Sequence, residues 1–462
     1  MPLLRENPRP SVPTNVPIDG PLPGENSRLA RVQLDRLKAL NIAMANSTSL
    51  LSGLADLRIA RANVEVQKLP MRTTFSLSSN DSRVITPGGQ YGANDFYQYN
   101  AAVTISQTIS TFGRVKWGVL QAKLASKQSA QNYRTALFGL LSAVDRGYVQ
   151  TVLSLELVRI AKARLEQRQR GLKSSESLFH AGVAAQYDVL QNRSAQAQAQ
   201  QALEAAQNEA QQARIDLLTQ LGLRPDAPVD VVLPVINPPP PPDSVEPGLD
   251  QALARRPELA ALRWAESAAQ AQIEAAARIN TPTLGLSTTY QGLNGNNGNV
   301  DNDWLVSLNL SINLGDGGAA RLQRAIARET LQQVRQGLEQ EKRAVAREVT
   351  SAYTQLVSLW QQRQSAQYTV RKAQEALQIA ELRYEEGVSS IIELLNSQDS
   401  YISARETLAR IVANYYLSRI EWMRATATDW PVALPPDLRV DWEFPSGAPQ
   451  PQSWQKRAEQ RP

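Results

Sequence analysis

Residues 383–398 read RYEEGVSSIIELLNSQ, and the organisation of the whole chain follows from this stretch. A diverged copy lies upstream, in register around a second Gly-Val pair at residues 182–183. The aligned pairs, all 205 residues apart (387 minus 182), are Gly182 and Gly387, Val183 and Val388, Asp188 and Glu393, Leu190 and Leu395, Leu203 and Leu408, and Ile215 and Ile420. A constant offset over this length predicts that the chain contains two copies of one unit.

Proline-rich segments flank and separate the two copies. Residues 2–24 contain seven prolines, and residues 238–242 are five prolines in a row, which favours extended chain over a folded element. We therefore predict five segments. These are an N-terminal arm (1–26), a first repeat (27–232), an equatorial linker (233–248), a second repeat (249–430) and a C-terminal tail (431–462).

Composition favours long packed helices and excludes several classes of protein. The 462 residues are 42% hydrophobic but only 6% aromatic, and 49 basic residues are interspersed with 44 acidic ones, which argues against nucleic acid as a partner. The chain has no cysteine and no run of about 18 apolar residues that predicts a transmembrane helix. Residues 1–24 lack the plan of a signal peptide. The sequence therefore either begins after a removed leader or belongs to a protein that stays inside the cell.

Each copy reads as helix, strand, strand, long helix, helix. In the first copy we predict helices over 27–68, 113–179 and 186–221, and strands over 71–79 and 97–109 with a loop between them. In the second we predict helices over 249–279, 316–384 and 390–427, with Asp316 as an N-cap. Its strands are expected over 283–290 and 306–314, again joined by a loop. Hydrophobic positions in both long helices recur at steps of three, four or seven residues, as in a coiled coil.

The strands alternate apolar residues with Ser, Thr and Asn, so each has one apolar and one polar face. Four strands are too few to close a barrel, which needs roughly eight. Open edges in lipid would leave unpaired backbone groups at several kcal/mol each. We therefore expect several chains to pool their strands into one barrel, with the apolar face outward and a wet lumen inside.

The doubled repeat, the Leu69-Pro70 and Thr281-Pro282 strand entries, the LGDGG helix start at residues 314–318 and the 383–398 stretch resemble TolC-type outer-membrane efflux channels. The resemblance covers residues 28–427. It implies an α+β membrane protein, a homotrimer whose twelve-stranded transmembrane β-barrel in outer-membrane lipid continues into an antiparallel α-helical coiled-coil tunnel in the periplasm. It further implies a passive exit duct for a tripartite efflux or type I secretion system, with a periplasmic adaptor and an inner-membrane pump as partners.

The resemblance also implies sites near the two helix-helix turns. The pore constriction falls on Glu393 and Asn396, where three Glu393 carboxylates would attract cations. The alternative for Glu393 is an exposed acid favoured by the helix dipole. The closed-state latch falls on Tyr384 and Asp188, with Ser389 where the family has an arginine, and packing on the helical seam is the alternative for Tyr384.

The same resemblance predicts that the adaptor docks at the turns. The docking residues would be Gly182, Val183, Ala184, Gly387, Val388 and Ser389. For the two glycines, the alternative is a positive φ that ends the helix, and both roles can hold at once.

Two other functions compete with the channel. A soluble coiled-coil scaffold explains the helical seams but not the four alternating strands, and a periplasmic adaptor would have one hairpin flanked by small β domains. An enzyme is disfavoured because no acid, base and nucleophile converge in the sequence. His180 is the only histidine, so we expect no metal site and no cofactor.

Overall fold

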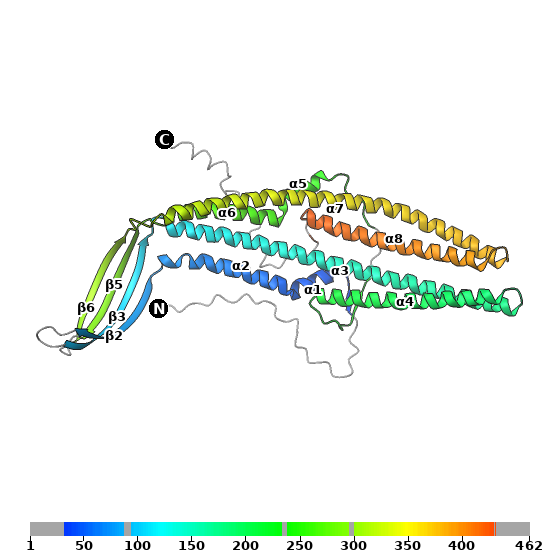
Figure 1. The fold of residues 1–462 in the computed structure, drawn as a ribbon, viewed down its shortest axis with the longest axis horizontal. Helices are drawn as coiled ribbons and strands as arrows, with labels where there is room; N and C mark the ends of the chain where they lie inside the picture. Colours follow the sequence, from blue (N-terminus) through cyan, green and yellow to red (C-terminus); the bar gives the residue numbers. More distant parts are fainter. Residues whose placement is uncertain (1–31, 87–93, 233–237, 295–299, 429, 431–462) are drawn as a thin grey trace.

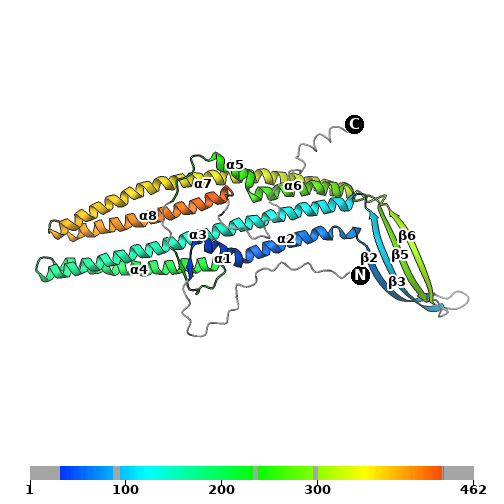
Figure 2. The same ribbon diagram turned by 180° about the vertical axis from the view of Figure 1, so that it is seen from behind.

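The computed structural model describes residues 32–86, 94–232, 238–294, 300–428 and residue 430. The predicted arm (1–26) and tail (431–462) lie outside these residues, as do residues 233–237 of the predicted linker. The molecule is elongated, with a β-sheet at one end and two helix-helix turns at the other (Figure 1). The view from behind shows the same arrangement, with the long helices α3 and α7 running from the sheet to the turns (Figure 2).

Eight α-helices and six strands are assigned in the described part of the chain. The helices are α1 (Arg36–Asn46), α2 (Thr48–Val66), α3 (Arg114–His180), α4 (Gln186–Gln220), α5 (Glu246–Arg255), α6 (Pro257–Ala276), α7 (Ala319–Glu385) and α8 (Ile391–Ala425), with a short 3-10 helix at Leu69–Met71. The strands are β1 (Val32–Leu34), β2 (Thr74–Thr86), β3 (Asn94–Ser110), β4 (Val229–Val231), β5 (Thr283–Asn294) and β6 (Val300–Ser311).

The main sheet is antiparallel throughout, in the order β2-β3-β5-β6. Side chains of a strand alternate between its two faces, so the register assigns each residue to one face. One face collects the apolar residues Phe75, Leu77, Val103, Ile105, Leu286, Tyr290, Trp304, Val306, Leu308 and Leu310. The other collects the hydroxyls, and Thr104 and Thr289 approach there to 3.1 Å between their Oγ1 atoms. The predicted segregation of the two kinds of residue is confirmed for most positions, with Thr288 on the apolar face and Leu305 on the polar face as exceptions.

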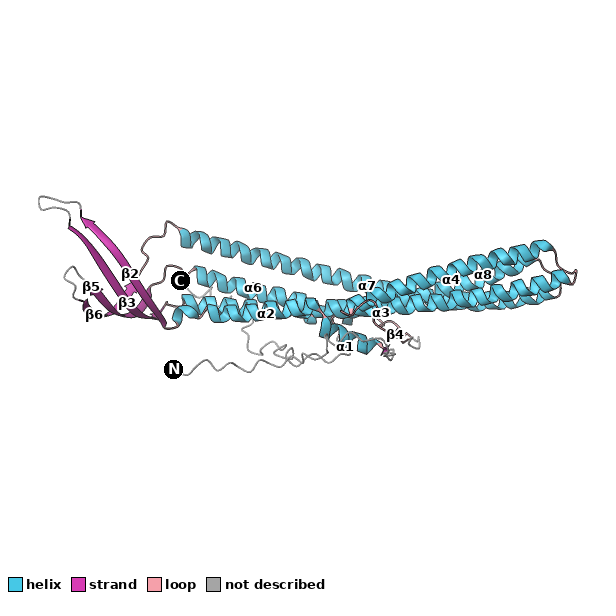
Figure 3. Ribbon diagram, turned by 90° about the horizontal axis from the view of Figure 1, so that it is seen from below, coloured by secondary structure: helices cyan, strands magenta, loops and turns pink. Residues whose placement is uncertain are grey.

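No helix of the described chain covers either face of this sheet. The helices instead continue from its end, as Figure 3 shows from below. The apolar face is consequently bare, and Phe75, Leu77 and Trp304 are 74%, 78% and 71% exposed. A bare face of this composition requires a partner that is itself apolar.

The two halves of the chain have helices of matching length and position. Both long helices have 67 residues, and α4 and α8 both have 35, so each pair of bounds differs by 205 residues. The long helices begin after Gly113 and Gly318, which have φ of 93° and 92°, a conformation that favours glycine. Asp316, predicted as the N-cap, lies two residues before the actual cap Gly318, but its carboxylate accepts the Ala320 N–H at 2.8 Å.

The predicted seam of α7 is largely confirmed, because Val345, Val349, Leu356, Leu359 and Leu377 are all buried. The seam of α3 is confirmed at Leu137, Leu141, Val144, Tyr148 and Leu165, which are buried, but not at every predicted position. Phe179, placed on it by the spacing, is 41% exposed, and Leu157 and Ile160 are buried instead. The reason is that α3 contacts α2, α4, α6 and α8 along its length, so its buried face changes with the partner.

The sequence of α8 has two adjacent columns of residues at seven-residue spacing, one through Leu394 and Tyr415 and the other through Leu395 and Ile402, which predict that the helix packs on two sides. The structure confirms this prediction. Ile402 and Ala413 of α8 join a buried cluster with α3, whereas Tyr415 packs against Leu356 and Leu359 of α7. α8 is therefore the element that joins the second hairpin, α7/α8, to the first, α3/α4.

Two predicted helices are each divided in two. The helix predicted over 27–68 breaks at Ser47, which ends α1 and whose hydroxyl accepts the Leu50 N–H at 3.3 Å at the start of α2. The helix predicted over 249–279 breaks before Pro257, because proline cannot donate a backbone hydrogen bond and restricts the residue before it. The first piece, α5, starts at Glu246, inside the predicted linker.

The strands are longer than predicted at the end of the sheet remote from the helices. β2 continues to Thr86 and β5 to Asn294, through residues that we predicted as loops. Their Asn, Asp and Gly residues have low strand propensity, but pairing with the neighbouring strand overrides it. β6 ends at Ser311, so Ile312 and Leu314 lie beyond it, and the parallel pair of β1 with β4 was not predicted.

Candidate functional site

The two helix-helix turns, here called the tip, lie at the end of the molecule opposite the sheet (Figure 1). In the second turn, Gly387 has a φ of 72°, and the Val388 N–H donates to the Arg383 carbonyl at 2.8 Å. In the first, Gly182 has a φ of 74°, and the Val183 N–H donates to the Leu178 carbonyl at 2.9 Å. This is the Schellman arrangement in both copies, and it confirms the helix-ending role of the two glycines.

Each turn presents one apolar side chain to solvent. Val183 is 75% exposed and Val388 is 66% exposed. An added Cβ on Gly182 or Gly387 would meet no atom within 4 Å, so both turns have open space around them. The predicted docking residues therefore form accessible surfaces, with Ala184 and Ser389 half-buried behind them.

Glu393 is held at the first turn of α8 by two contacts within the chain. Its backbone N–H donates to the Ser390 hydroxyl at 3.3 Å, so Ser390 caps the helix. Its carboxylate accepts a hydrogen bond from Arg383 Nη1 at 2.7 Å, across the turn from the last turn of α7. Arg383 was not among the predicted site residues, although a basic residue ten positions before an acid, with a glycine turn between them, is a visible sequence signal for this pair.

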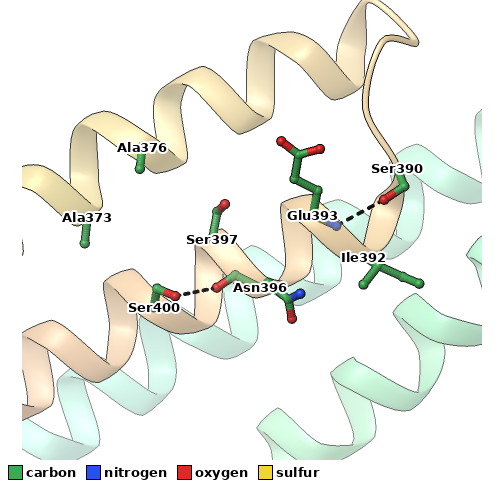
Figure 4. Close-up of a pocket in the computed structure, with 8 residues that line it drawn as sticks. All are labelled: Ala373, Ala376, Ser390, Ile392, Glu393, Asn396, Ser397 and Ser400. Carbon is green, nitrogen blue, oxygen red and sulfur yellow. Dashed lines mark hydrogen bonds between the residues drawn. The ribbon is translucent and has the colours of Figure 1, made fainter.

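Glu393 and Asn396 line one pocket of about 410 Å³ between α7 and α8, with Ser390, Ser397 and Ser400 (Figure 4). Figure 4 shows Glu393 directed towards α7, whereas Asn396 points away from it. The exposed side chains of α8 recur every three or four residues along one stripe, at Ile392, Asn396, Ser400, Ser403, Thr407, Arg410 and Asn414. Asn396 therefore lies on the unpartnered stripe of α8, and Glu393 lies at its border.

The side chains of the three predicted latch residues, Tyr384, Asp188 and Ser389, form no hydrogen bond to one another over the residues that the structure describes. In the described chain, the hydroxyls of Tyr384 and Ser389 are buried without a hydrogen-bond partner. Burial raises the pKa of the Tyr384 phenol, and the nearby Asp188 carboxylate raises it further. Asp188 therefore acts on Tyr384 through its charge, and no hydrogen bond between the two is formed.

A buried arginine joins the two hairpins farther from the tip. Arg168 of α3 is 3% exposed and donates to Gln398 at 2.7 Å and to Asp399 at 2.6 Å, both on α8. Arg164 donates to the same Asp399 oxygen at 2.7 Å. We call these four side chains the hairpin clamp. The clamp has a signal in the sequence: Arg168 follows Leu165 by three residues and precedes Leu172 by four, a position where the helical spacing otherwise predicts an apolar residue.

Near the middle of the molecule, equivalent tyrosines of the two long helices bind the connecting segments. The Tyr148 hydroxyl donates to the Val232 carbonyl at 2.7 Å, and the Tyr353 hydroxyl donates to the Asp243 carbonyl at 3.1 Å. Tyr148 and Tyr353 are again 205 residues apart. The segments on both sides of residues 233–237 therefore wrap against the long helices at this level.

Within the described ranges, no group of three or more His, Cys, Asp and Glu side chains is arranged to hold a metal ion. Over the same residues, no helix combines the length and the hydropathy needed to cross a membrane.

The sequence profile of the outer membrane efflux proteins matches residues 39–223 and 248–428, which is most of both halves. The chain belongs to this family. Among curated relatives of this outer membrane efflux protein, protein CyaE of Bordetella pertussis is 27% identical, with 84% of this chain and 82% of the relative covered. The pyoverdine export outer membrane protein OpmQ of Pseudomonas putida is 24% identical, with 88% of each chain covered.

Among solved structures, the outer-membrane channel OprN superposes with a TM-score of 0.74 at 21% identity, over 87% of this chain and 94% of that one. The fold of this efflux protein is therefore that of the outer-membrane channels, as the sequence resemblance predicted.

Proposed function

We propose that this outer membrane efflux protein is the exit duct of a tripartite efflux or type I secretion system. It is a passive conduit that catalyses no reaction, lies in the outer membrane and is gated at its periplasmic tip. The observation that supports this best is the main sheet, whose apolar face is bare and whose polar face carries Ser, Thr and Asn. A single chain cannot satisfy either face or the two edge strands in lipid.

The proposed assembly is a homotrimer with a twelve-stranded barrel and a helical tunnel, built from two repeats per chain. This assembly is supported by the order of the elements, because the edge strands of the sheet and the outermost helices lie on the same two sides of the chain. β2 and β6 are the sheet edges, and the helical contacts run α2-α3-α6-α7, so α2 and α7 are the outermost helices there. Both carry exposed apolar residues, including Ile59 and Ile326 at 59% and 63%. One flank of a copy would join the opposite flank of the next, which closes a ring.

Replacing Leu308 with lysine is expected to abolish assembly in the outer membrane. Leu308 lies on the apolar face and is 66% exposed, and a lysine at the middle of a lipid-facing strand costs about 2–4 kcal/mol per copy. The adjacent Ser307→Lys variant, on the polar face, is the matched control and should still assemble. For both variants, membrane fractionation measures insertion into the outer membrane, and the mass of the detergent-extracted protein measures trimer formation. Normal trimers of Leu308→Lys, or a wild-type monomer without detergent, would overturn the proposed assembly.

At the tip, we propose that Glu393 and Asn396 line the constriction, with Asn396 as a neutral ring. Asn396→Asp is then expected to raise the permeability ratio of potassium to chloride about threefold, because a ring of charge concentrates cations in a narrow pore. The ratio is measured in planar bilayers, and Asn396→Gln should leave it unchanged. An Asn396→Asp channel with the wild-type ratio would show that residue 396 does not line the constriction.

We further propose that the adaptor docks at the two turns and that an inner-membrane pump supplies the energy. Val183→Asp and Val388→Asp are expected to weaken adaptor binding about tenfold each, since both place a charge in an apolar contact. Val232→Asp, which changes an exposed valine near the middle of the molecule, outside the tip and outside the flanking helices α2 and α7, is the control. Surface plasmon resonance with the purified adaptor gives the affinities, and equal losses for all three variants would argue against docking at the tip.

Tyr384, Asp188 and Ser389 are proposed as a closed-state latch that lacks the arginine of related channels. Tyr384→Phe should then increase single-channel open time. An unchanged open time would leave Tyr384 as a packing residue of α7.

A further inference from the structure

We infer that Arg383 sets the ion selectivity of the tip by neutralising Glu393 within the same chain. The inference rests on the proposed function, because it assumes that Glu393 lies at the constriction. It adds a functional residue, Arg383, that the family resemblance does not assign. It also reverses the expectation that the Glu393 ring attracts cations. A ring of three isolated carboxylates would attract cations, whereas a ring of three arginine–glutamate pairs has no net charge.

Backbone hydrogen bonds hold both Arg383 and Glu393 in place at the turn. Arg383 lies in the last turn of α7, and its carbonyl accepts the N–H groups of Val388 and Ser389 at 2.8 and 3.2 Å. Glu393 lies in the first turn of α8, and its N–H is bound by the Ser390 cap. The hydrogen bonds that shape the turn therefore also bring the guanidinium to 2.7 Å from the carboxylate.

The helix dipoles favour the same arrangement. A cation is stabilised near the C-terminus of a helix and an anion near the N-terminus, which are the positions of Arg383 and Glu393. Their side chains are 47% and 43% exposed, so the pair is accessible to ions that pass the tip. An exposed pair adds little to stability. Its effect on the local charge does not depend on that stability.

The first turn has no such compensation. The residue equivalent to Arg383 is Leu178, 205 positions earlier, and the residue equivalent to Glu393 is Asp188. Among the described residues, the Asp188 carboxylate has no salt bridge. The exposed Glu385 and Glu386, beside Gly387 in the second turn, likewise form no salt bridge in the part of the chain that the structure describes, so Glu393 is the acid of that turn that an arginine compensates. Any cation preference of the wild-type channel therefore arises at acids of the tip other than Glu393, such as Asp188.

The test measures the potassium-to-chloride permeability ratio of the full-length channel in planar bilayers. Arg383→Gln should raise the ratio about threefold by exposing three negative charges, and Glu393→Gln should lower it about as much by exposing three positive ones. The double variant should return to the wild-type ratio. These differences in permeability ratio should be smaller in about 1 M salt than in about 0.1 M salt, because the Debye length falls from roughly 10 Å to 3 Å.

Two controls separate local charge from other effects. Arg383→Lys keeps the charge and should keep the ratio. Lys372→Gln removes one positive charge from the same helix, more than two turns from the tip and away from the proposed constriction, and should change the ratio far less. If Glu393→Gln shifts the ratio but Arg383→Gln does not, the inference is wrong and the proposed constriction stands. If neither variant conducts differently from wild type, or no channel forms, the proposed site itself fails.

Discussion

Asp399→Ala is expected to loosen the contact between α3 and α8 by about 2–3 kcal/mol. The substitution leaves Arg168, which is 3% exposed, with Gln398 as its only partner on α8, and an unpaired buried charge costs roughly 3–5 kcal/mol. The smaller cost of about 2–3 kcal/mol applies because the Asp399 side chain is itself 47% exposed, so water can reach the site that its carboxylate leaves. Burial already lowers the pKa of Arg168, and Asp399 is the main opposing influence.

Hydrogen exchange of the α3 and α8 amides around the hairpin clamp measures this loss. About a thirtyfold to hundredfold faster exchange is expected there, at tenfold for each 1.4 kcal/mol, with little change in α2. Glu375→Ala, which removes an exposed pair with Lys372, is the control and should cost under about 1 kcal/mol. The double variant Arg168→Met/Asp399→Leu should regain most of the stability, since an apolar pair replaces the ionic one. Equal exchange in Asp399→Ala and wild type would mean that the clamp does not hold the hairpins.

Asp145→Ala is expected to destabilise the middle of the molecule by about 3 kcal/mol. Asp145 of α3 is 1% exposed and accepts three hydrogen bonds, two from Arg36 at 2.8 and 2.6 Å and one from Trp430 Nε1 at 2.7 Å. Its removal leaves a buried indole N–H unpaired and releases α1, whose first residue is Arg36. The contact with Asp145 is also the main reason why the pKa of Arg36 is raised.

Amide exchange in α1 and the fluorescence of Trp430, read against a Trp430→Phe background, measure this release. Faster exchange in α1, with α4 unaffected, is the expected pattern. The matched control is Asp226→Ala, whose carboxylate pairs with Arg224 on an exposed turn at 70% exposure. If Asp145→Ala and Asp226→Ala had the same small effect, the Arg36–Asp145–Trp430 contact would contribute nothing to holding α1 on α3.

Features that depend on short-range periodicity were predicted well. The seam of α7, the two faces of α8 and the apolar and polar faces of the sheet all follow from spacings within one element. The glycine turns at residues 182 and 387 follow from the need for a positive φ. Ser47 and Pro257 also act locally, but the hydrophobic pattern continues across both breaks, so periodicity alone missed them.

Features that depend on which elements meet were predicted poorly. The extra length of β2 and β5 comes from hydrogen bonds to neighbouring strands, not from their own residues. The exposed Phe179 and the buried Leu157 of α3 depend on which helix lies opposite each turn. The latch at Tyr384 and Asp188, which the resemblance implied, stays a prediction, because the described chain contains no hydrogen bond from the Tyr384 hydroxyl.

The amino-acid sequence alone determined the two-copy plan, the length of each long helix and the split of the strands into two faces, because these arise from interactions between residues a few positions apart. The tertiary structure alone decided that Arg383 neutralises Glu393, that Arg168 reaches Asp399, and that no helix covers the sheet. A rotation of a long helix by one residue, about 100°, would break the Arg383–Glu393 and Arg168–Asp399 contacts without changing the hydrophobic periodicity of the sequence.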